Sequence, residues 1–355
     1  MLGRLLIKHD FYCQLQIRAL AFARSGPTGS NLSVERDLHI RGSLRTAGLS
    51  GAAVYLTQCV IALALLLPAA QAQDEASVQV SDALGRLVRI TSTQRVVTLG
   101  SDITEIVFAL GAEDRIVAVD RGSRFPEDAT SKDNVGYRRR LSTEGLLSLN
   151  PDLILAAEDI GPPETVDVLK QIEIPLVLVP KHDSGEGIRR KIELVAAALS
   201  LETEGRKLAE EVLEKFDSAT RLADMIPQAK RKKVVFFHGV ERLTAAGADT
   251  AADAIIRYAG GINPMDAFQG YKAASEEKLI ELAPDVILMM SNGRGGPTPD
   301  EVFSNRALSV TPAAQTRSLI VLDGAYMIGF GPRTADAVRD LTKALYGVEL
   351  KSDGE

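Results

Sequence analysis

One stretch of sequence occurs twice in this chain, and this repeat constrains the fold more than any other feature. Ser142–Leu155 reads STEGLLSLNPDLIL and Ser275–Leu288 reads SEEKLIELAPDVIL, with eight of fourteen positions identical at an offset of 133 residues. In each copy a serine precedes a short amphipathic stretch, Pro-Asp follows it, and an apolar run typical of a buried strand comes next. The repeat therefore predicts a helix followed by a buried strand in each half of the chain.

The sequence upstream of the two copies is also related. A Gly-Tyr pair precedes each copy, at Gly136-Tyr137 and Gly270-Tyr271. Farther upstream, RVVTLG at 95–100 and KVVFFHG at 233–239 each indicate a strand that runs into a loop and then a helix. Alternating short apolar strands and helices are typical of parallel α/β sheets. We therefore expect two Rossmann-like α/β lobes, each with a central parallel sheet.

The segment between the two halves predicts a rigid connection. Residues 202–225 form one helical pattern with Leu208, Val212 and Phe216 on one face, and Pro227 follows it. A helix of about 23 residues is about 35 Å long, enough to cross between two lobes with a ligand cleft between them. The predicted organisation is a removed presequence over 1–72, an N-terminal α/β lobe over 73–200, a single long linking helix within 201–228 and a C-terminal α/β lobe over 229–355.

The N-terminal region has the pattern of a secretory signal peptide. Tyr55–Ala70 reads YLTQCVIALALLLPAA, and Ala70-Gln71-Ala72 forms a small-x-small cleavage site. We expect cleavage after Ala72 and a periplasmic location. Cys59 lies in the apolar run without the small residue expected before a lipidated cysteine, which favours a soluble exported form.

Removing residues 1–72 changes the chemistry available to the chain. It leaves 34 basic and 44 acidic residues, a net charge of −10, and no cysteine, because Cys13 and Cys59 are both removed. Disulfides, cysteine-ligated zinc and cysteine nucleophiles are thereby excluded. His182 and His238 are the remaining histidines, too few for the usual three- or four-ligand transition-metal site.

Several function classes are disfavoured by composition and motif content. The full chain has a formal net charge of −6, which opposes general nucleic-acid binding because such proteins need a basic surface. We find no nucleophile elbow, Walker loop, nucleotide-binding GxGxxG or HExxH motif. Binding of small ligands or protein partners therefore remains, and we expect a monomer that is not an enzyme and has no catalytic cofactor.

Several motifs together resemble a known family. DALGR at Asp82–Arg86, the strand from Arg95, the long central helix and the paired Pro-Asp repeats resemble the helix-linked periplasmic binding proteins of ABC importers for iron complexes and cobalamin. The haem-binding branch is resembled by GYRRRLSTEGLLSLNPD from Gly136, AAGADTAADA from Ala245, GYKAASEE from Gly270 and FGPRT from Phe330. The resemblance covers residues 78–347. It implies capture of haem b (ferric hemin) and delivery to an ABC permease dimer with a cytoplasmic ATPase, downstream of an outer-membrane haem receptor system.

The resemblance makes Tyr137 the expected axial ligand of the haem iron. A tyrosinate ligates ferric haem in catalase, and the following Arg138, Arg139 and Arg140 bring positive charge that favours a phenolate. Arg139 is placed to hydrogen-bond the phenolate oxygen, while Arg138 or Arg140 is placed to pair with a propionate. A surface loop with solvated arginines is the alternative interpretation.

Four more residues are candidates for contact with the ligand, each with a structural alternative. Tyr271, the repeat partner of Tyr137, either meets the distal face of the porphyrin or closes its own loop. His238, at a strand end, is either an additional iron contact or simply hydrogen-bonded. Arg333 follows a predicted strand over 326–330 and either binds a propionate or ties its loop to the sheet. Met327 is expected to line an apolar pocket with Tyr326, although one of these two must face the core.

The repeat also predicts a docking surface. Glu144 and Glu277 occupy the same place in the two copies, at the start of the predicted helices. In the family that the chain resembles, one glutamate on each lobe meets arginines of the permease dimer. The alternative is a favourable interaction of each carboxylate with its own helix dipole. Other functions left open are a siderophore or cobalamin binding protein on the same scaffold, an exported haem chaperone or sensor domain, and an exported α/β enzyme.

Overall fold

Both copies of the sequence repeat form a helix and a buried strand. The computed structural model describes residues 77–293 and 295–347, and these described residues form one compact unit. The two copies form α4 (Thr143–Leu147) with β6 (Leu153–Ala157), and α9 (Glu276–Leu282) with β11 (Val286–Ser291). In each copy the leading serine, Ser142 or Ser275, accepts a backbone N–H three residues on and so caps its helix. The predicted signal peptide and its cleavage site lie outside the described residues.

The N-terminal lobe (residues 77–199) contains a five-stranded sheet that is parallel throughout, in the order β5-β4-β3-β6-β7. A separate antiparallel hairpin of β1 (Val78–Ser81) and β2 (Leu87–Ile90) precedes it, and Asp82 fixes the hairpin turn by pairing with Arg86. The remaining elements of this lobe are β3 (Val96–Leu99), α3 (Ser101–Ala109), η1 (Glu113–Arg115), β4 (Ile116–Val119), η2 (Glu127–Ser131), β5 (Asp133–Asn134), α5 (Pro163–Gln171), β7 (Leu176–Val179) and α6 (Gly185–Ala198).

The C-terminal lobe (residues 228–347) contains a five-stranded mixed sheet in the order β10-β9-β8-β11-β12. Strands β8, β11 and β12 are parallel, whereas β9 runs antiparallel to both of its neighbours, β8 and β10. The loop from β8 to β9 is too short for a parallel crossover. Besides α9 and β11, this lobe contains η3 (Gln228–Lys230), β8 (Val234–Phe237), β9 (Thr244–Ala246), α8 (Ala251–Tyr258), β10 (Tyr271–Ala273), α10 (Pro299–Phe303), α11 (Arg306–Ser309), α12 (Pro312–Gln315), β12 (Leu319–Asp323), α13 (Gly324–Ile328) and α14 (Thr334–Tyr346).

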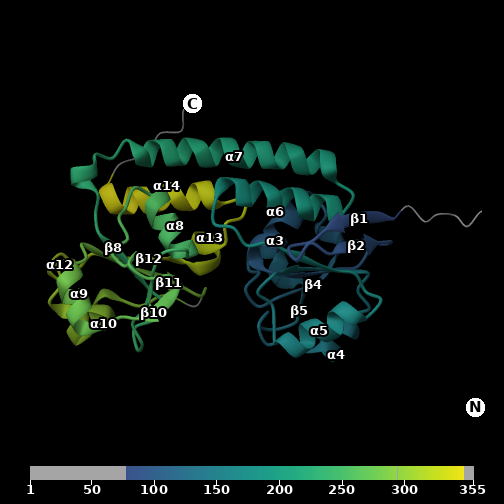
Figure 1. The fold of residues 1–355 in the computed structure, drawn as a ribbon, viewed down its shortest axis with the longest axis horizontal. Coiled ribbons are helices and arrows are strands. Elements are labelled where there is room, and N and C mark those ends of the chain that lie inside the picture. The colour runs from purple at the N-terminus through teal and green to yellow at the C-terminus, as the bar shows by residue number, and fades with distance from the viewer. Residues whose placement is uncertain (1–76, 294, 348–355) are drawn as a thin grey trace, which may run out of the picture. The chain divides into compact units, whose positions relative to one another are not determined.

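The long helix predicted between the lobes is α7 (Glu202–Asp224). Figure 1 shows α7 running along α6 of the N-terminal lobe and α14 of the C-terminal lobe, and both helices pack against it. The predicted fold of two α/β lobes is confirmed, and the antiparallel pairing of β9 with β8 and β10 is a local departure from the expected parallel sheet. Within the described ranges, none of the helices combines the length and the apolarity needed for a membrane span.

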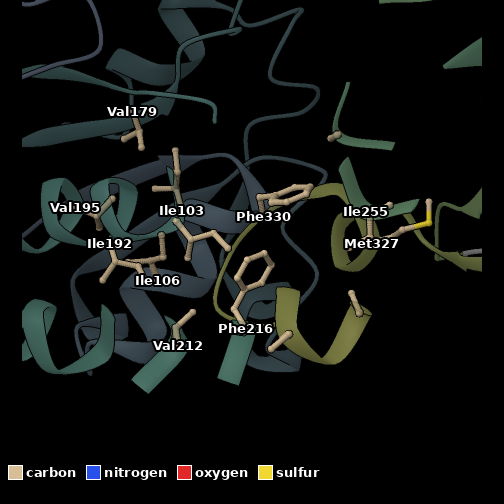
Figure 2. Close-up of a cluster of buried hydrophobic side chains, with 14 of the residues drawn as sticks. Ile103, Ile106, Val179, Ile192, Val195, Val212, Phe216, Ile255, Met327 and Phe330 are labelled. Carbon is tan, nitrogen blue, oxygen red and sulfur yellow. The ribbon is translucent and has the colours of Figure 1, made fainter. Parts of the chain in front are cut away.

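The hydrophobic core beneath α7 is continuous from one lobe to the other. Figure 2 shows Phe330 of the C-terminal lobe in the same cluster as Phe216 of α7, Ile103 of α3 and Met327 of α13. Each lobe also has a separate core on the other face of its sheet. Because apolar burial contributes about 25 cal/mol per Å², this shared core opposes a wide separation of the lobes.

Candidate functional site

A cleft of about 610 Å³ lies between the lobes, at the carboxyl ends of the parallel strands of both sheets. This is where open α/β sheets place their binding residues, because successive loops converge there. The N-terminal wall is made by residues after β3, β4, β5, β6 and β7, and the C-terminal wall by residues after β8, β11 and β12 together with Tyr271. The volume lies within the usual range for a small-molecule site, about 300–1,000 Å³.

Tyr137 projects from a loop that the backbone holds tightly. Gly136 adopts φ +86°, a left-handed conformation that favours glycine, and its N–H donates to the side chain of Asn134 at 2.9 Å. The carbonyl of Gly136 accepts the N–H of Arg121 at 2.8 Å, and the carbonyl of Tyr137 accepts the N–H of Arg140 at the same distance. The phenol ring is therefore presented at the cleft surface, where Tyr137 is 36% exposed.

Asp159 organises the two arginines that follow Tyr137. Arg138 donates two hydrogen bonds to its carboxylate, at 3.0 and 3.1 Å, and Arg139 donates a third at 2.5 Å. Arg139 also donates to the phenol oxygen of Tyr137 at 3.1 Å. Burial alone would raise the pKa of Asp159, but the bonds and charges of Arg138 and Arg139 outweigh it and lower the pKa to about 2.

The same carboxylate limits what these arginines can do for a ligand. Arg138 is already paired with Asp159 in a bidentate geometry and is half-buried, so a ligand carboxylate would have to compete with Asp159 for it. Arg140 is exposed and is not among the residues that line the cleft. The propionate role expected for Arg138 or Arg140 therefore has little geometric support.

Two cations that the sequence analysis did not single out also face the cleft. Arg121 lies with its guanidinium carbon 5.2 Å from the centre of the Tyr137 ring, and Lys181 lies on the loop after β7. Neither side chain forms an ion pair with a carboxylate of the described residues. The buried Asp120 fixes the loop that carries Arg121, because its carboxylate accepts the backbone N–H groups of Gly100 and Gly122. Arg121 and Lys181 come just after the strands β4 and β7, and this position was the sequence signal that could have identified them as cleft residues.

The opposite wall carries an aromatic cluster. The rings of His238 and Tyr271 lie 4.5 Å apart between centroids, and Phe236 packs edge-on against His238 at 5.2 Å. Burial lowers the pKa of His238, and the charges of Arg139 and Lys181 lower it further, so the imidazole is neutral near pH 7. Burial raises the pKa of Tyr271, which keeps its phenol protonated. The structure thus brings Tyr271 and His238 together across the cleft from Tyr137.

The expectation that Met327 lines the cleft is wrong. The segment predicted as a strand over 326–330 instead contains the end of helix α13, whose residues Ala325 and Ile328 face the cleft together with Gly329, which follows the helix. Met327 points away from these positions, as the helical period requires, and is fully buried in the shared core. Tyr326 lies in a separate side cavity of about 350 Å³.

Arg333 does not line the main cleft either. It donates to both carboxylate oxygens of Glu105 on α3, at 2.9 and 2.5 Å, and stacks on the ring of Phe125 at 3.5 Å. Of the two roles that the sequence left open, this geometry favours the structural one, with the difference that Arg333 is tied to a helix and not to the sheet.

Glu144 and Glu277 lie in the first turns of α4 and α9, and both side chains are exposed. Hydrogen bonds from its own backbone N–H and from Ser275 lower the pKa of Glu277. Both carboxylates are therefore available on the surface, one on each lobe. Among the described residues, no group of three or more His, Cys, Asp or Glu side chains is arranged to hold a metal ion.

Comparison with known families agrees with this architecture. The model of the periplasmic binding protein family matches residues 96–326, which includes the strands of both central sheets and the whole of α7. The chain belongs to the periplasmic binding protein family. The chain is similar to an uncharacterised ABC transporter substrate-binding lipoprotein from Bacillus subtilis, 24% identical over 76% of this chain and 85% of that protein. A vitamin B12-binding protein from Yersinia pseudotuberculosis is 26% identical over 56% of this chain and 70% of that protein.

Solved structures with the same fold include several haem-binding proteins. The periplasmic haem-binding protein RhuT from Roseiflexus sp. RS-1 is 38% identical with a TM-score of 0.68, over 73% of this chain and 100% of that one. BhuT, solved in complex with two haems, is 34% identical with a TM-score of 0.67 over the same shares. HutB of Vibrio cholerae is 31% identical with a TM-score of 0.64, over 72% of this chain and 100% of that one. The resemblance to helix-linked binding proteins is thereby confirmed.

Proposed function

We propose that this chain is a periplasmic solute-binding protein that captures ferric haem in its interlobe cleft and hands it to an ABC permease. The observation that carries the proposal is the contact between Tyr137 and Arg139. A phenol at the cleft surface with a guanidinium 3.1 Å from its oxygen has the arrangement needed to bind ferric iron as a phenolate, because the adjacent cation stabilises the negative charge. Asp159 fixes the position of that guanidinium.

The remaining cleft surface also suits haem. Haem is a flat apolar ring that carries two carboxylates, and Arg121 and Lys181 supply cations beside Tyr137 that have no carboxylate partner among the described residues. Tyr271 and the neutral His238 supply an aromatic wall on the other side. In this proposal Tyr137 is the iron ligand, Arg139 supports the phenolate, Tyr271 and His238 contact the distal face, and Arg121 and Lys181 take the propionates.

Cobalamin is the second candidate, because vitamin B12-binding proteins are among the relatives of this chain. Two features of the cleft favour haem over cobalamin. The periphery of the corrin ring carries amides, and cobalamin has a single phosphodiester where haem has two carboxylates, so it offers the cations of the cleft fewer anionic partners. Cobalamin is also about twice as heavy as haem, whereas the cleft volume is about 610 Å³.

Parallel equilibrium titrations with haemin and cyanocobalamin distinguish the two. We expect saturable binding of haemin, accompanied by a shift of its Soret absorption band, and much weaker binding of cyanocobalamin. Saturable binding of cyanocobalamin at lower concentrations than haemin would replace haem by cobalamin in the proposal. The stoichiometry of the haemin titration also shows whether one haem or two are held.

Delivery to the permease is proposed to use Glu144 and Glu277. The two exposed carboxylates lie at equivalent places on the two lobes, which suits a permease made of two subunits with basic residues at its outer surface. The joint charge reversal of Glu144→Lys and Glu277→Lys should leave haemin binding intact and stop haem-dependent growth of cells that rely on the importer. Normal growth with the doubly reversed protein would remove the docking role.

The cellular setting follows from the same proposal. The protein would be exported through the signal peptide that ends at Ala72, act as a monomer without catalytic turnover and receive haem that enters through an outer-membrane receptor. N-terminal sequencing of the exported protein tests the cleavage site. A mature protein that begins at Gln73 is the expected result, and an uncleaved or lipidated N-terminus would contradict it.

A further inference from the structure

Lys191 is a buried cation that the proposed binding chemistry does not use. It lies on the buried face of α6 and is 1% exposed, although lysine is rarely buried without partners. Its ammonium group is bonded to Asp102 and also donates to the carbonyls of Gly329 and Phe330 at 3.2 and 3.1 Å. All three ammonium protons are therefore satisfied, which a buried lysine requires.

The acceptors of Lys191 come from both lobes. Asp102 lies in the first turn of α3 and lines the cleft, whereas Gly329 and Phe330 belong to the segment that joins α13 to α14 in the C-terminal lobe. This joining segment (residues 329–333) contacts the N-terminal lobe directly. A Cβ atom added at Gly331 would lie 3.3 Å from the Cβ of Asp102, tighter than ordinary contacts. The backbone of one lobe is thus packed against the cleft floor of the other.

A second ion pair holds the same joining segment. Glu105 lies one helical turn after Asp102 on α3, so both carboxylates lie on the same face of that helix. Glu105 is 6% exposed and accepts hydrogen bonds from Nε and Nη2 of Arg333 at the far end of the segment. The two pairs, Asp102–Lys191 and Glu105–Arg333, together form what we call the α3 clasp.

The backbone inside the α3 clasp is conformationally unusual. Phe330 adopts φ +49°, in the left-handed region that a bulky side chain rarely occupies, while its ring is buried in the shared core (Figure 2). Such a conformation persists only where the surroundings determine it. Here the determinants are the buried ring on one side and the ammonium of Lys191 on the carbonyl of Phe330 on the other.

We infer that Lys191 is a positioning residue that fixes the angle between the lobes, and hence the width of the ligand cleft, by anchoring the joining segment to α3. The Arg124–Asp323 pair also crosses between the lobes, at 2.6 Å, but both side chains are about one-third exposed. The buried α3 clasp therefore acts as the fixed pivot, and the exposed Arg124–Asp323 pair is the contact that breaks and re-forms when the cleft opens.

The inference is tested by measuring the distance between the lobes directly. Spin labels are attached to cysteines introduced at two exposed positions, Val168→Cys in α5 and Val310→Cys after α11, one on each lobe. The chain also carries Cys13→Ser and Cys59→Ser, so that no other cysteine is labelled. Pulsed electron paramagnetic resonance then gives the distance distribution without and with haemin. We expect a single narrow distribution for the otherwise unaltered protein, and a longer and broader one for Lys191→Met.

A matched control distinguishes a change in the position of the lobes from a general loss of stability. Arg86→Met also removes a cation that bonds a buried carboxylate and a carbonyl, but all its partners, Asp82 and Leu176, lie in the N-terminal lobe. It should lower stability and leave the distance distribution unchanged. Because Lys191→Met leaves Asp102 without its partner and risks failure to fold, Glu105→Gln serves as a second variant, which should lengthen the distances to a smaller extent.

The rate of haemin dissociation gives an independent measurement, and it is the one measurement here that rests on the proposed function. A cleft that closes less completely should release haemin about tenfold faster in Lys191→Met, and at an unaltered rate in Arg86→Met. A folded Lys191→Met or Glu105→Gln protein with an unaltered distance distribution would overturn the inference. If the distances lengthen but the unaltered protein binds no haemin, the positioning role stands and the proposed function fails.

Discussion

Replacing Asp159 by asparagine is expected to remove a measurable and pH-dependent part of the stability of this protein. The substitution keeps the shape of the side chain but removes the charge that Arg138 and Arg139 share. The ion pairs lower the carboxyl pKa from 3.8 to about 2. Such a change corresponds to at most about 2.4 kcal/mol, since each pKa unit is worth 1.36 kcal/mol. The side chain is 26% exposed, so solvent screening reduces the expected cost to about 1 kcal/mol.

The sign of the pH dependence follows from the lowered pKa. The stabilisation is fully present above the unfolded-state pKa of 3.8 and is lost as the pH falls through the folded-state value of about 2. By pH 3 about half of it has gone. The difference in stability between the unaltered protein and Asp159→Asn should therefore shrink by about half between pH 7 and pH 3.

Urea unfolding at both pH values, followed by circular dichroism, measures this difference. Asp167→Asn is the control, because Asp167 is 67% exposed and pairs only with Lys170 at 3.4 Å; its effect should be close to zero at both pH values. Equal urea midpoints for the unaltered protein and Asp159→Asn at pH 7, or a difference that does not change by pH 3, would refute the reasoning.

Three further outcomes follow from the structure. The double substitution Arg121→Gln and Lys181→Gln should weaken haemin binding by about five- to tenfold without a change in the urea midpoint, because these cations have no carboxylate partner among the described residues; unaltered affinity would exclude them as propionate contacts. The ring of His238 should titrate below pH 6.5 in proton NMR spectra of the ligand-free protein, and a midpoint above that value would contradict its burial beside Arg139. Phe330→Ala should cost about 3–5 kcal/mol in calorimetry or urea unfolding, whereas a loss below about 1 kcal/mol would show that the shared core does not depend on this ring.

Much of the fold could be predicted because the same helix-and-strand sequence pattern occurs in both halves of the chain. The two copies of the repeat each carry a capping serine, a short apolar face and a buried strand, and these local signals agree with the tertiary arrangement. The helix predicted over 202–225 is α7, Glu202–Asp224, because its apolar residues recur at helical spacing and Pro227 follows it.

The local errors have identifiable physical causes. Tyr326–Phe330 is rich in apolar residues and suggested a strand, but the side chain of Asp323 accepts the N–H of Tyr326 and caps a short helix there. Short apolar runs do not distinguish a strand from a buried helical turn, and the misplacement of Met327 followed from this. The antiparallel pairing of β9 with β10 joins two separate segments of the chain, and periodicity within one segment does not report such pairing.

The residues of the candidate site could be predicted where they belong to the repeat. They could not be predicted where they depend on pairing between side chains that are far apart in the sequence. Tyr137 and Tyr271 follow from the repeated Gly-Tyr, and both line the cleft. The partners Asp159 for Arg139 and Glu105 for Arg333 lie 20 and 228 residues away in sequence, so only the folded chain reveals them. Lys191 gave a weak signal, as a charged residue on the apolar face of α6, but its partners in the other lobe could not be identified in advance.

The most direct test of the central claim is the absorption spectrum of the haemin complex in two tyrosine variants. The proposal predicts that the unaltered protein shows the charge-transfer band of a ferric haem bound by tyrosinate, that Tyr137→Phe abolishes this band, and that Tyr271→Phe retains it. Loss of the band in Tyr271→Phe with its retention in Tyr137→Phe would contradict the assignment of the iron ligand. Absence of saturable haemin binding by the unaltered protein would contradict the proposed function itself.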